Sequence, residues 1–146
     1  MRILAPLLLM GLVAACATVP MDSAQQDAAG KQFAPPPPGR AALYVYRESL
    51  LGSAVSIPVS LGTRPLGSLP SDTWFLVDVE PGTYDVRCNA TEGSDARSVT
   101  LAPGETRYVE VAIRMGVLGA RCGVSEVDPQ AGQKGVLGGK RAAEIR

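Results

Sequence analysis

The chain has no histidine among its 146 residues, which removes the commonest general base and the commonest metal ligand together. Aromatic residues make up only 5%, and neither charge is in excess, because 14 Lys and Arg stand against 14 Asp and Glu. This balance excludes a polybasic nucleic-acid binder as a description of the whole chain. A Gly-x-Ser-x-Gly elbow and a phosphate-binding glycine loop are also missing. We therefore expect a protein that is not an enzyme and that uses neither a metal nor a cofactor.

Glycine and proline are abundant instead, with 16 and 12 residues, which favours strands and turns over long helices. The length supports one domain. Apolar alternation predicts about seven short strands, so we expect an all-β fold, a small antiparallel β-sandwich over residues 40–146. The segments that carry this pattern include residues 41–47, 55–61, 75–79, 84–88, 99–101, 109–113 and 119–127.

Local signals refine this prediction at four places. Residues 41–47 are apolar on both faces, as in a central strand, whereas Pro58 indicates a strand at a sheet edge. Asp128 and Pro129 are suited to the N-cap and first turn of a short helix, although the glycines that follow make it a poor one. We expect residues 140–146 to fray.

Two hairpins are predicted from the register of apolar residues. The Pro81-Gly82 pair is typical of a type II turn, and pairing across it places Phe75, Val77 and Val79 on one face with Tyr84, Val86 and Cys88. The same register sets Asp78 opposite Asp85 on the outer face, as a carboxylate pair or as charges neutralised by Arg87 or Arg47. A second hairpin with a bulge near Gly104 would join residues 99–101 to 109–113.

The first residues form a separate segment. Met1 and Arg2 precede an apolar run over residues 3–15 that is too short to span a bilayer but suits a signal peptide. The run ends in Val13-Ala14-Ala15-Cys16, which resembles the lipobox of bacterial lipoproteins. That resemblance implies cleavage before Cys16, a diacylglyceryl group on its sulfur and acylation of the new amine. An ordinary signal peptide or a buried helix with a chance cysteine are the alternatives.

Residues 16–39 lack periodic apolar residues and end in four prolines and a glycine. We interpret them as the lipidated N-terminus and a flexible, Pro-rich linker that holds the domain off the membrane. A passive leader segment with no role as a spacer would have the same sequence features. Among double-membraned bacteria, Asp after the lipidated Cys favours the inner membrane. Because Ala17 stands there, the resemblance implies the periplasmic face of the outer membrane, with the inner membrane as the alternative.

The strand region itself resembles a known family. Leu43-Tyr44-Val45-Tyr46-Arg47, Val59-Ser60-Leu61-Gly62, Gly67-Ser68-Leu69 and Val79-Glu80-Pro81-Gly82 are similar to the pattern of the bacterial lipoprotein family DUF2846, over residues 42–113. The resemblance implies a compartment and a β-sandwich fold. It implies no activity and assigns no functional residues.

Cys88 and Cys122 are the two thiols that remain after Cys16. Both lie at inward strand positions, and the predicted compartment is oxidising, so we expect a structural disulfide. The alternative is a redox pair, but there is no Cys-x-x-Cys motif to support it.

Candidate partner contacts are Trp74, on the outer face by alternation, and the apolar loop from Met115 to Leu118. Each could instead cover the domain's own surface. Together these features predict a membrane-anchored periplasmic lipoprotein that acts as a non-catalytic interaction or envelope-structural module. It would bind the membrane through its lipid and an envelope protein or cell-wall partner. The alternative is a small-ligand-binding lipoprotein, recognisable by a concave apolar pocket.

Overall fold

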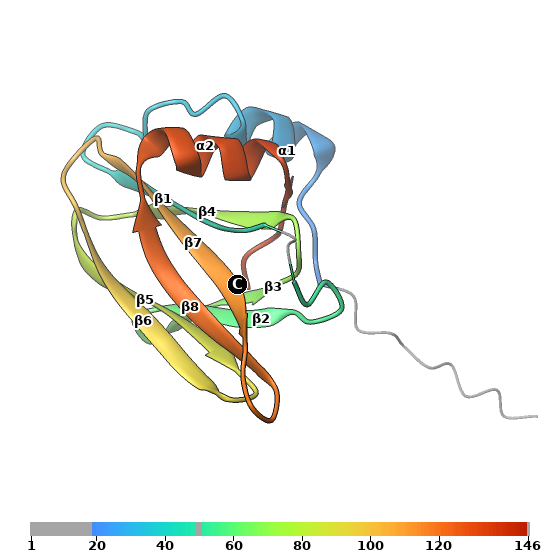
Figure 1. Cartoon of the computed structure of the whole chain (residues 1–146). Helices are drawn as coiled ribbons and strands as arrows, with labels where there is room; N and C mark the ends of the chain where they lie inside the picture. Colours follow the sequence, from blue (N-terminus) through green and yellow to red (C-terminus); the bar gives the residue numbers. More distant parts are fainter. Residues whose placement is uncertain (1–18, 49–50, 146) are drawn as a thin grey trace, which may run out of the picture.

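The computed structural model describes residues 19–48 and 51–145. The signal peptide over residues 1–15 and the lipidation site Cys16 lie outside these residues. The domain is a sandwich of two sheets with two short helices on the outer face of one of them (Figure 1). The elements are α1 (Ala24–Gly30), β1 (Ala41–Arg47), β2 (Ile57–Leu61), β3 (Arg64–Leu69), β4 (Thr73–Val79), β5 (Gly82–Ala90), β6 (Gly93–Leu101), β7 (Thr106–Met115), β8 (Ala120–Val127), α2 (Pro129–Leu137) and β9 (Lys140–Arg141).

The predicted β-sandwich is confirmed, and its strands divide unequally. One sheet has five strands in the order β8-β7-β1-β4-β9, and the other has four in the order β3-β2-β5-β6. The five-stranded sheet is mixed rather than antiparallel, because β1 runs parallel to β7 and β4 runs parallel to β9. Every residue of β1 is buried, as expected for a central strand whose sheet is covered on both faces.

The inner faces of the two sheets form the main core. It is built mostly from aliphatic residues together with Phe75 and the two cysteines, and the inward positions of β4 and β5 both contribute to it. The inward faces predicted for these two strands are therefore correct. On the outer side of the four-stranded sheet, by contrast, the outward residues of β5 are largely exposed and the first six residues of β6 are all exposed, so no described element covers them.

Both predicted hairpins are wrong, because each turn crosses from one sheet to the other. β4 pairs with β1 and β9, whereas β5 pairs with β2 and β6. β6 and β7 are likewise in different sheets. Apolar alternation shows which side chains of a strand point into the core. It is the same whether two consecutive strands pair in one sheet or face each other from opposite sheets. Asp78 and Asp85 consequently lie apart: Asp78 accepts a hydrogen bond from Arg40 at 2.8 Å, and Asp85 accepts one from Ser98.

The edge position predicted from Pro58 is also wrong, since β2 lies between β3 and β5. The ladder from β2 to β5 covers Val59, Ser60 and Leu61 only. Pro58 is paired with Ser68 of β3 but lies just outside the ladder to β5, so at its own position β2 has a partner on one side only.

The flexible linker predicted over residues 16–39 is wrong for the part that is described. Ser23 caps α1 by accepting a hydrogen bond from the backbone N–H of Gln26, and the Gln26 side chain returns to the Ser23 backbone. These two contacts form a capping box. The helix then lies on the five-stranded sheet, where the Tyr44 hydroxyl donates to the Gly30 carbonyl at 2.8 Å.

The C-terminal residues are ordered rather than frayed. Lys140 and Arg141 form β9 at the edge of β4, and Ala142 is buried beneath the first described residues, where it bridges to Met21. Residues 140–143 thus have backbone partners on two sides, in β4 and in residues 20–22. The predicted helix after Asp128 is confirmed as α2, with Asp128 accepting from the Ala131 N–H and Pro129 in the first turn.

Candidate interaction surface

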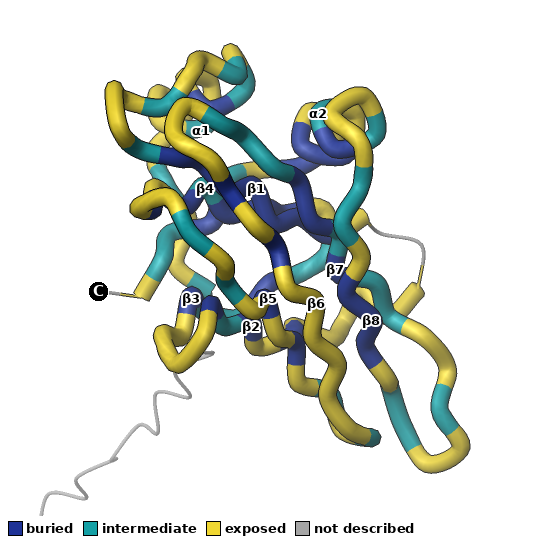
Figure 2. Tube along the Cα trace, turned by 90° about the vertical axis from the view of Figure 1, so that its left-hand side faces the viewer, coloured by how far each residue is buried: buried dark blue, intermediate teal, exposed yellow. Residues whose placement is uncertain are grey.

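The loop between β7 and β8 is the most exposed apolar part of the described chain. Met115 is 80% exposed, Val117 is 87% exposed and Leu118 is 90% exposed. We call residues 115–118 the hairpin tip. In Figure 2 this end of β7 and β8 projects beyond the two sheets, on the side of the domain opposite the C-terminus. Three bare apolar side chains at one projecting point make a small surface suited to burial by another molecule.

The hairpin tip is held in place by its own turn and by a neighbouring loop. The Gly116 N–H donates to the Gly119 carbonyl at 2.8 Å, which closes the turn. The N–H of Glu92, between β5 and β6, donates to the Ala120 carbonyl at 3.0 Å, and its carboxylate lies 3.7 Å from Arg121. A Cβ added at Gly116 would come within 1.6 Å of the Glu92 carboxylate, so the two loops are in close contact.

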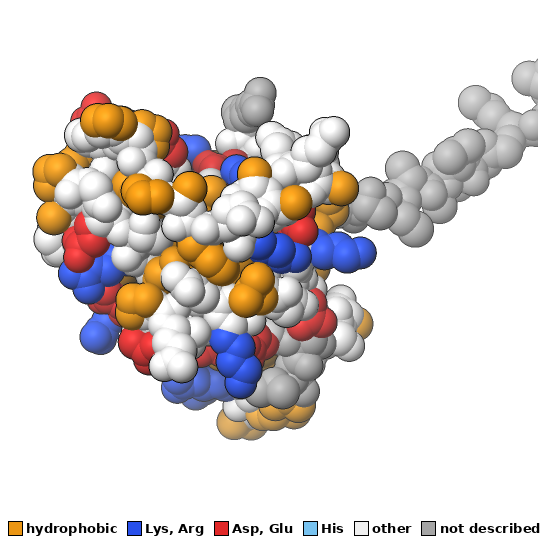
Figure 3. All heavy atoms as spheres, turned by 90° about the horizontal axis from the view of Figure 1, so that it is seen from above, with side chains coloured by type: hydrophobic (Ala, Val, Ile, Leu, Met, Phe, Trp, Pro, Cys, Tyr) orange, Lys and Arg blue, Asp and Glu red, His pale blue; other side chains and the backbone are white. Residues whose placement is uncertain are grey.

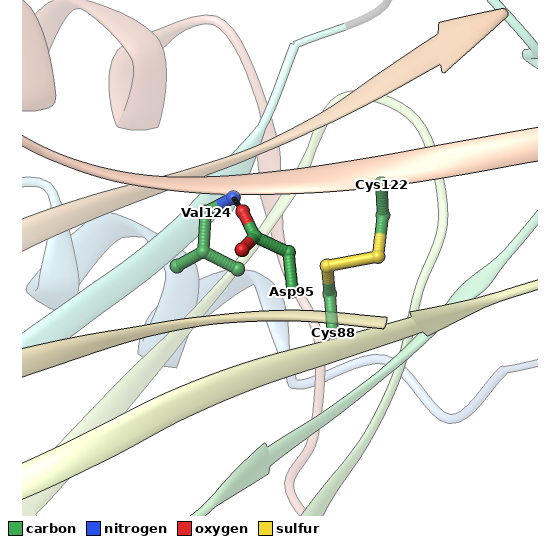
Figure 4. The surroundings of a disulfide bond; sticks show 4 residues. All are labelled: Cys88, Asp95, Cys122 and Val124. Carbon is green, nitrogen blue, oxygen red and sulfur yellow. Dashed lines mark hydrogen bonds between the residues drawn. A yellow bond between two sulfur atoms is a disulfide. The ribbon is translucent and has the colours of Figure 1, made fainter. Parts of the chain in front are cut away.

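The predicted disulfide is present (Figure 4), and its Cys122 follows the hairpin tip closely in the sequence, on β8. Cys88 on β5 and Cys122 on β8 connect the two sheets, with 6.3 Å between their Cα atoms. Beside it, Asp95 of β6 accepts a hydrogen bond from the backbone N–H of Val124 at 2.8 Å. The disulfide and this hydrogen bond, together with the one from Glu92 to Ala120, therefore attach β8 to the opposite sheet, and the tip it carries is preorganised.

Trp74, the second predicted contact, is not on the surface. Its side chain is 0% exposed and lies with Tyr44, Tyr46, Tyr108 and Val136 in a second apolar cluster on the outer face of the five-stranded sheet. We call this cluster the aromatic patch. A Cβ added at Gly30 of α1 would come within 2.3 Å of the Trp74 ring, so the helix rests directly on the indole. The outward orientation was predicted correctly, but α1 covers the ring, and Trp74 cannot serve as a surface anchor here.

The tyrosines of the aromatic patch are equally enclosed. Tyr44 stacks on Tyr108 with 5.1 Å between ring centroids, and Phe33 closes the side at 5.7 Å from Tyr44. Burial raises the pKa of the Tyr44 hydroxyl to about 12, which agrees with its enclosed position under α1. Seen from above, the helical face shows small groups of hydrophobic side chains separated by charged and polar ones (Figure 3).

Arg47 is a structural residue that the sequence did not identify as such. It is 1% exposed, and its guanidinium donates to the carbonyls of Leu69 at 3.0 Å and Gly52 at 2.7 Å, and also to that of Val55. Burial lowers the pKa of this guanidinium. Arg47 thus attaches the loop after β1 to the end of β3, and it does not neutralise Asp78 or Asp85 as expected.

Two open clefts, each of about 520 Å³, lie elsewhere on the surface. One is lined by Arg64, Arg141 and Asp22, and the other by Arg107, Glu105 and Glu126 among others. Several of their charged groups are already paired: Arg64 with Glu144 and Arg141 with Asp22 in the first cleft, and Arg107 with Glu105 at 2.5 Å and Glu126 at 3.0 Å in the second. Within the described ranges, no group of three or more Cys, Asp or Glu side chains could hold a metal ion.

These features define the class of protein: a disulfide-linked sandwich of two sheets, with one face covered by helices and one bare apolar tip. The chain belongs to the family described as "Protein of unknown function (DUF2846)", whose model matches residues 37–123. It is also similar to an uncharacterized protein of Haemophilus influenzae, with 25% identity over 125 residues, 86% of this chain and 74% of the relative. The matched family segment contains the hairpin tip and both cysteines of the disulfide.

Among residues 19–48 and 51–145, no helix has the length and hydropathy needed to cross a membrane.

Proposed function

We propose that this protein is a lipid-anchored lipoprotein of the bacterial envelope and that it binds a partner through the hairpin tip without catalysis. The anchor is Cys16, on the evidence of the Val13-Ala14-Ala15-Cys16 motif. Ala17 favours the periplasmic face of the outer membrane over that of the inner membrane. The single observation that carries the interaction role is the exposure of Met115, Val117 and Leu118 on a turn whose following strand is attached to the opposite sheet by the disulfide.

A rigid apolar tip is favourable for binding for two reasons. Burying each of these side chains removes apolar surface from water, which contributes about 1.5–3 kcal/mol per residue. Because the disulfide and the Glu92 contact already fix the turn, little conformational entropy remains to be lost on association. Arg114 and Arg121 face each other across the hairpin just behind the tip. The partner we propose is therefore an envelope protein with an apolar pocket and an acidic rim.

The alternative function, binding of a small ligand, has weaker support. Each of the two clefts contains charged side chains that pair with one another, rather than a concave apolar wall with a few converging polar groups.

Photo-crosslinking from the hairpin tip tests the interaction. A photoreactive amino acid at Val117, in the full-length protein in native envelopes, should yield one discrete crosslinked product. Leu118→Asp should remove that product because a charge would have to enter the apolar pocket. Leu137→Asp is the matched control, since Leu137 is a 56% exposed leucine on α2, and it should leave the product unchanged. Equal yields from both variants would contradict the assignment of the tip.

The anchor is tested separately by mass. Protein extracted from membranes should exceed the mass of residues 16–146 by a glycerol and two or three acyl chains, and Cys16→Ser should abolish this increment. Recovery of unmodified protein from the soluble periplasmic fraction would contradict lipidation whatever the crosslinking shows.

A further inference from the structure

The two ends of the described chain are joined along one face of the domain. The Asp22 N–H donates to the Arg141 carbonyl at 3.0 Å, and the Ala143 N–H donates to the Pro20 carbonyl at 3.0 Å. Further on, the Ile145 N–H donates to the Leu66 carbonyl of β3 at 2.8 Å. We call this region, made of residues 20–22, 64–66 and 141–145, the terminal face.

Side chains reinforce the join. The Asp22 carboxylate lies 2.7 Å from the Arg141 guanidinium, and the Arg141 backbone N–H donates to the Asp27 carboxylate at 2.7 Å. Arg141 also lies over the Trp74 ring at 5.8 Å, so it links the terminal face to the aromatic patch. The chain is thus integrated into the domain from Pro20 onwards, and residues beyond this point add no free length to a tether.

This placement limits how far the domain can move from an anchor at Cys16. Pro20 lies four positions after Cys16, and a fully extended chain over four positions spans at most about 14 Å. A compact domain of about 125 residues has a radius of gyration near 14 Å and is about 35 Å across. The reach is shorter than half the width of the domain, so the domain cannot turn its opposite side towards the anchoring surface.

We propose that this short reach holds the terminal face against a phospholipid bilayer, an inference that rests on the proposed lipidation of Cys16. The exposed chemistry fits that occupant. Met21 is 44% exposed and Ile145 is 55% exposed, and the side chain of Arg64, the first residue of β3, is 52% exposed and pairs with Glu144. Apolar side chains beside an arginine suit the boundary between acyl chains and phosphate headgroups.

The orientation has a consequence for the hairpin tip. Figure 2 shows the C-terminus and the loop between β7 and β8 on opposite sides of the domain. With the terminal face on the bilayer, the tip points away from the membrane and is presented to partners that are not embedded beside the anchor. The bilayer is therefore the occupant of the terminal face and not of the tip.

The test uses the chain from Cys16 to Arg146 with an anchor imposed chemically. Because Cys88 and Cys122 are bonded to each other, the Cys16 thiol can be coupled selectively to a maleimide lipid in nanodiscs of phosphatidylethanolamine and phosphatidylglycerol. Lipids carrying a gadolinium chelate then broaden the NMR signals of nearby amides. We expect the amides of Arg64 and Ile145 to lose more than half of their intensity, and those of Val117 and Leu118 to lose almost none.

A variant with a longer segment between Cys16 and Pro20 tests whether the short length of this segment causes the orientation. Twelve Gly and Ser residues inserted between Thr18 and Val19 lengthen the extended span to about 54 Å, more than the width of the domain, and should reduce the contrast between the two regions at least twofold. Equal broadening of both regions in the original chain, or stronger broadening at the tip, would overturn the proposal. A contrast unchanged by the insertion would overturn the role of reach.

Because the anchor is attached in vitro, these results do not depend on whether cells lipidate Cys16. Failure of the proposed function would appear in the mass of the native protein, and failure of the orientation would appear only in the nanodisc spectra.

Discussion

The aromatic patch and the hairpin tip both looked like partner contacts in the sequence, but the structure gives them opposite environments. Trp74 is completely buried beneath α1, whereas Leu118 is 90% exposed at the end of a turn. Both regions are apolar and both point away from the main core. They differ in whether another part of the chain is close enough to cover them.

The reason lies in topology. The outer face of the five-stranded sheet is broad, and segments from both ends of the chain return to it as α1 and α2 (Figure 1). The hairpin tip extends past both sheets, where no described element lies above it. A large outward-facing aromatic residue in a central strand is thus better evidence for a missing covering element than for a binding site.

Truncation of the covered ring should have the largest effect. Trp74→Ala leaves a cavity beneath Gly30, and we expect a loss of about 3–5 kcal/mol in the free energy of unfolding. Urea denaturation followed by circular dichroism measures it. The matched variant Val117→Ala removes apolar atoms that are already in water and should change stability by less than about 0.5 kcal/mol. Similar losses in the two variants would contradict the different environments of the two regions.

Removal of the disulfide between β5 and β8 should have the next largest effect. Cys88 and Cys122 are 34 residues apart, so Cys88→Ser combined with Cys122→Ser should lower the free energy of unfolding by about 2–4 kcal/mol through the entropy of the unfolded chain. The double variant also frees β8 from β5. Hydrogen exchange of the Ala120 and Arg121 amides should accelerate more than that of Tyr44 on β1. Uniform acceleration of all amides would show that the bond does not act locally.

Loss of the helix cap should have the smallest effect. Ser23→Ala removes the capping oxygen of α1 and should lower stability by about 1 kcal/mol. Because the chain has one tryptophan, quenching of its fluorescence by acrylamide reports how well α1 covers it, and quenching should increase. Ser23→Asp keeps an acceptor at the cap and should restore protection. If neither variant alters quenching, the cap does not determine how α1 sits on Trp74.

Much of the fold could be predicted because its signals are local. The apolar run at residues 41–47 identified the central strand β1, and Asp128 with Pro129 identified the start of α2. The alternation around Cys88 and Cys122 placed both cysteines inward, and with the expected oxidising compartment this predicted their bond.

What could not be predicted depends on contacts between distant segments. The alternation of residues 75–79 does not show whether the next strand, β5, lies beside β4 or across the core from it. The pairing of β4 with β1 depends on the arrangement of the whole domain. The helix α1 had a signal that was missed: Ser23 and Gln26 have the spacing of a capping box. The burial of Arg47 could not be predicted, because the carbonyl groups that accept its hydrogen bonds belong to Leu69 and Gly52 and reach it only in the folded chain.

The union of the chain ends also determines when the fold can be completed. The contact between Arg141 and Asp27 spans 114 residues, and closing so long a loop costs roughly 2 kcal/mol more than closing one of ten residues. Residues 141–145 are synthesised after every other described segment, so on an emerging chain α1 has no partner in β9 and residues 20–22 remain free. The contacts of residues 20–22 with residues 141–143 therefore form last, after the rest of the described chain has been synthesised.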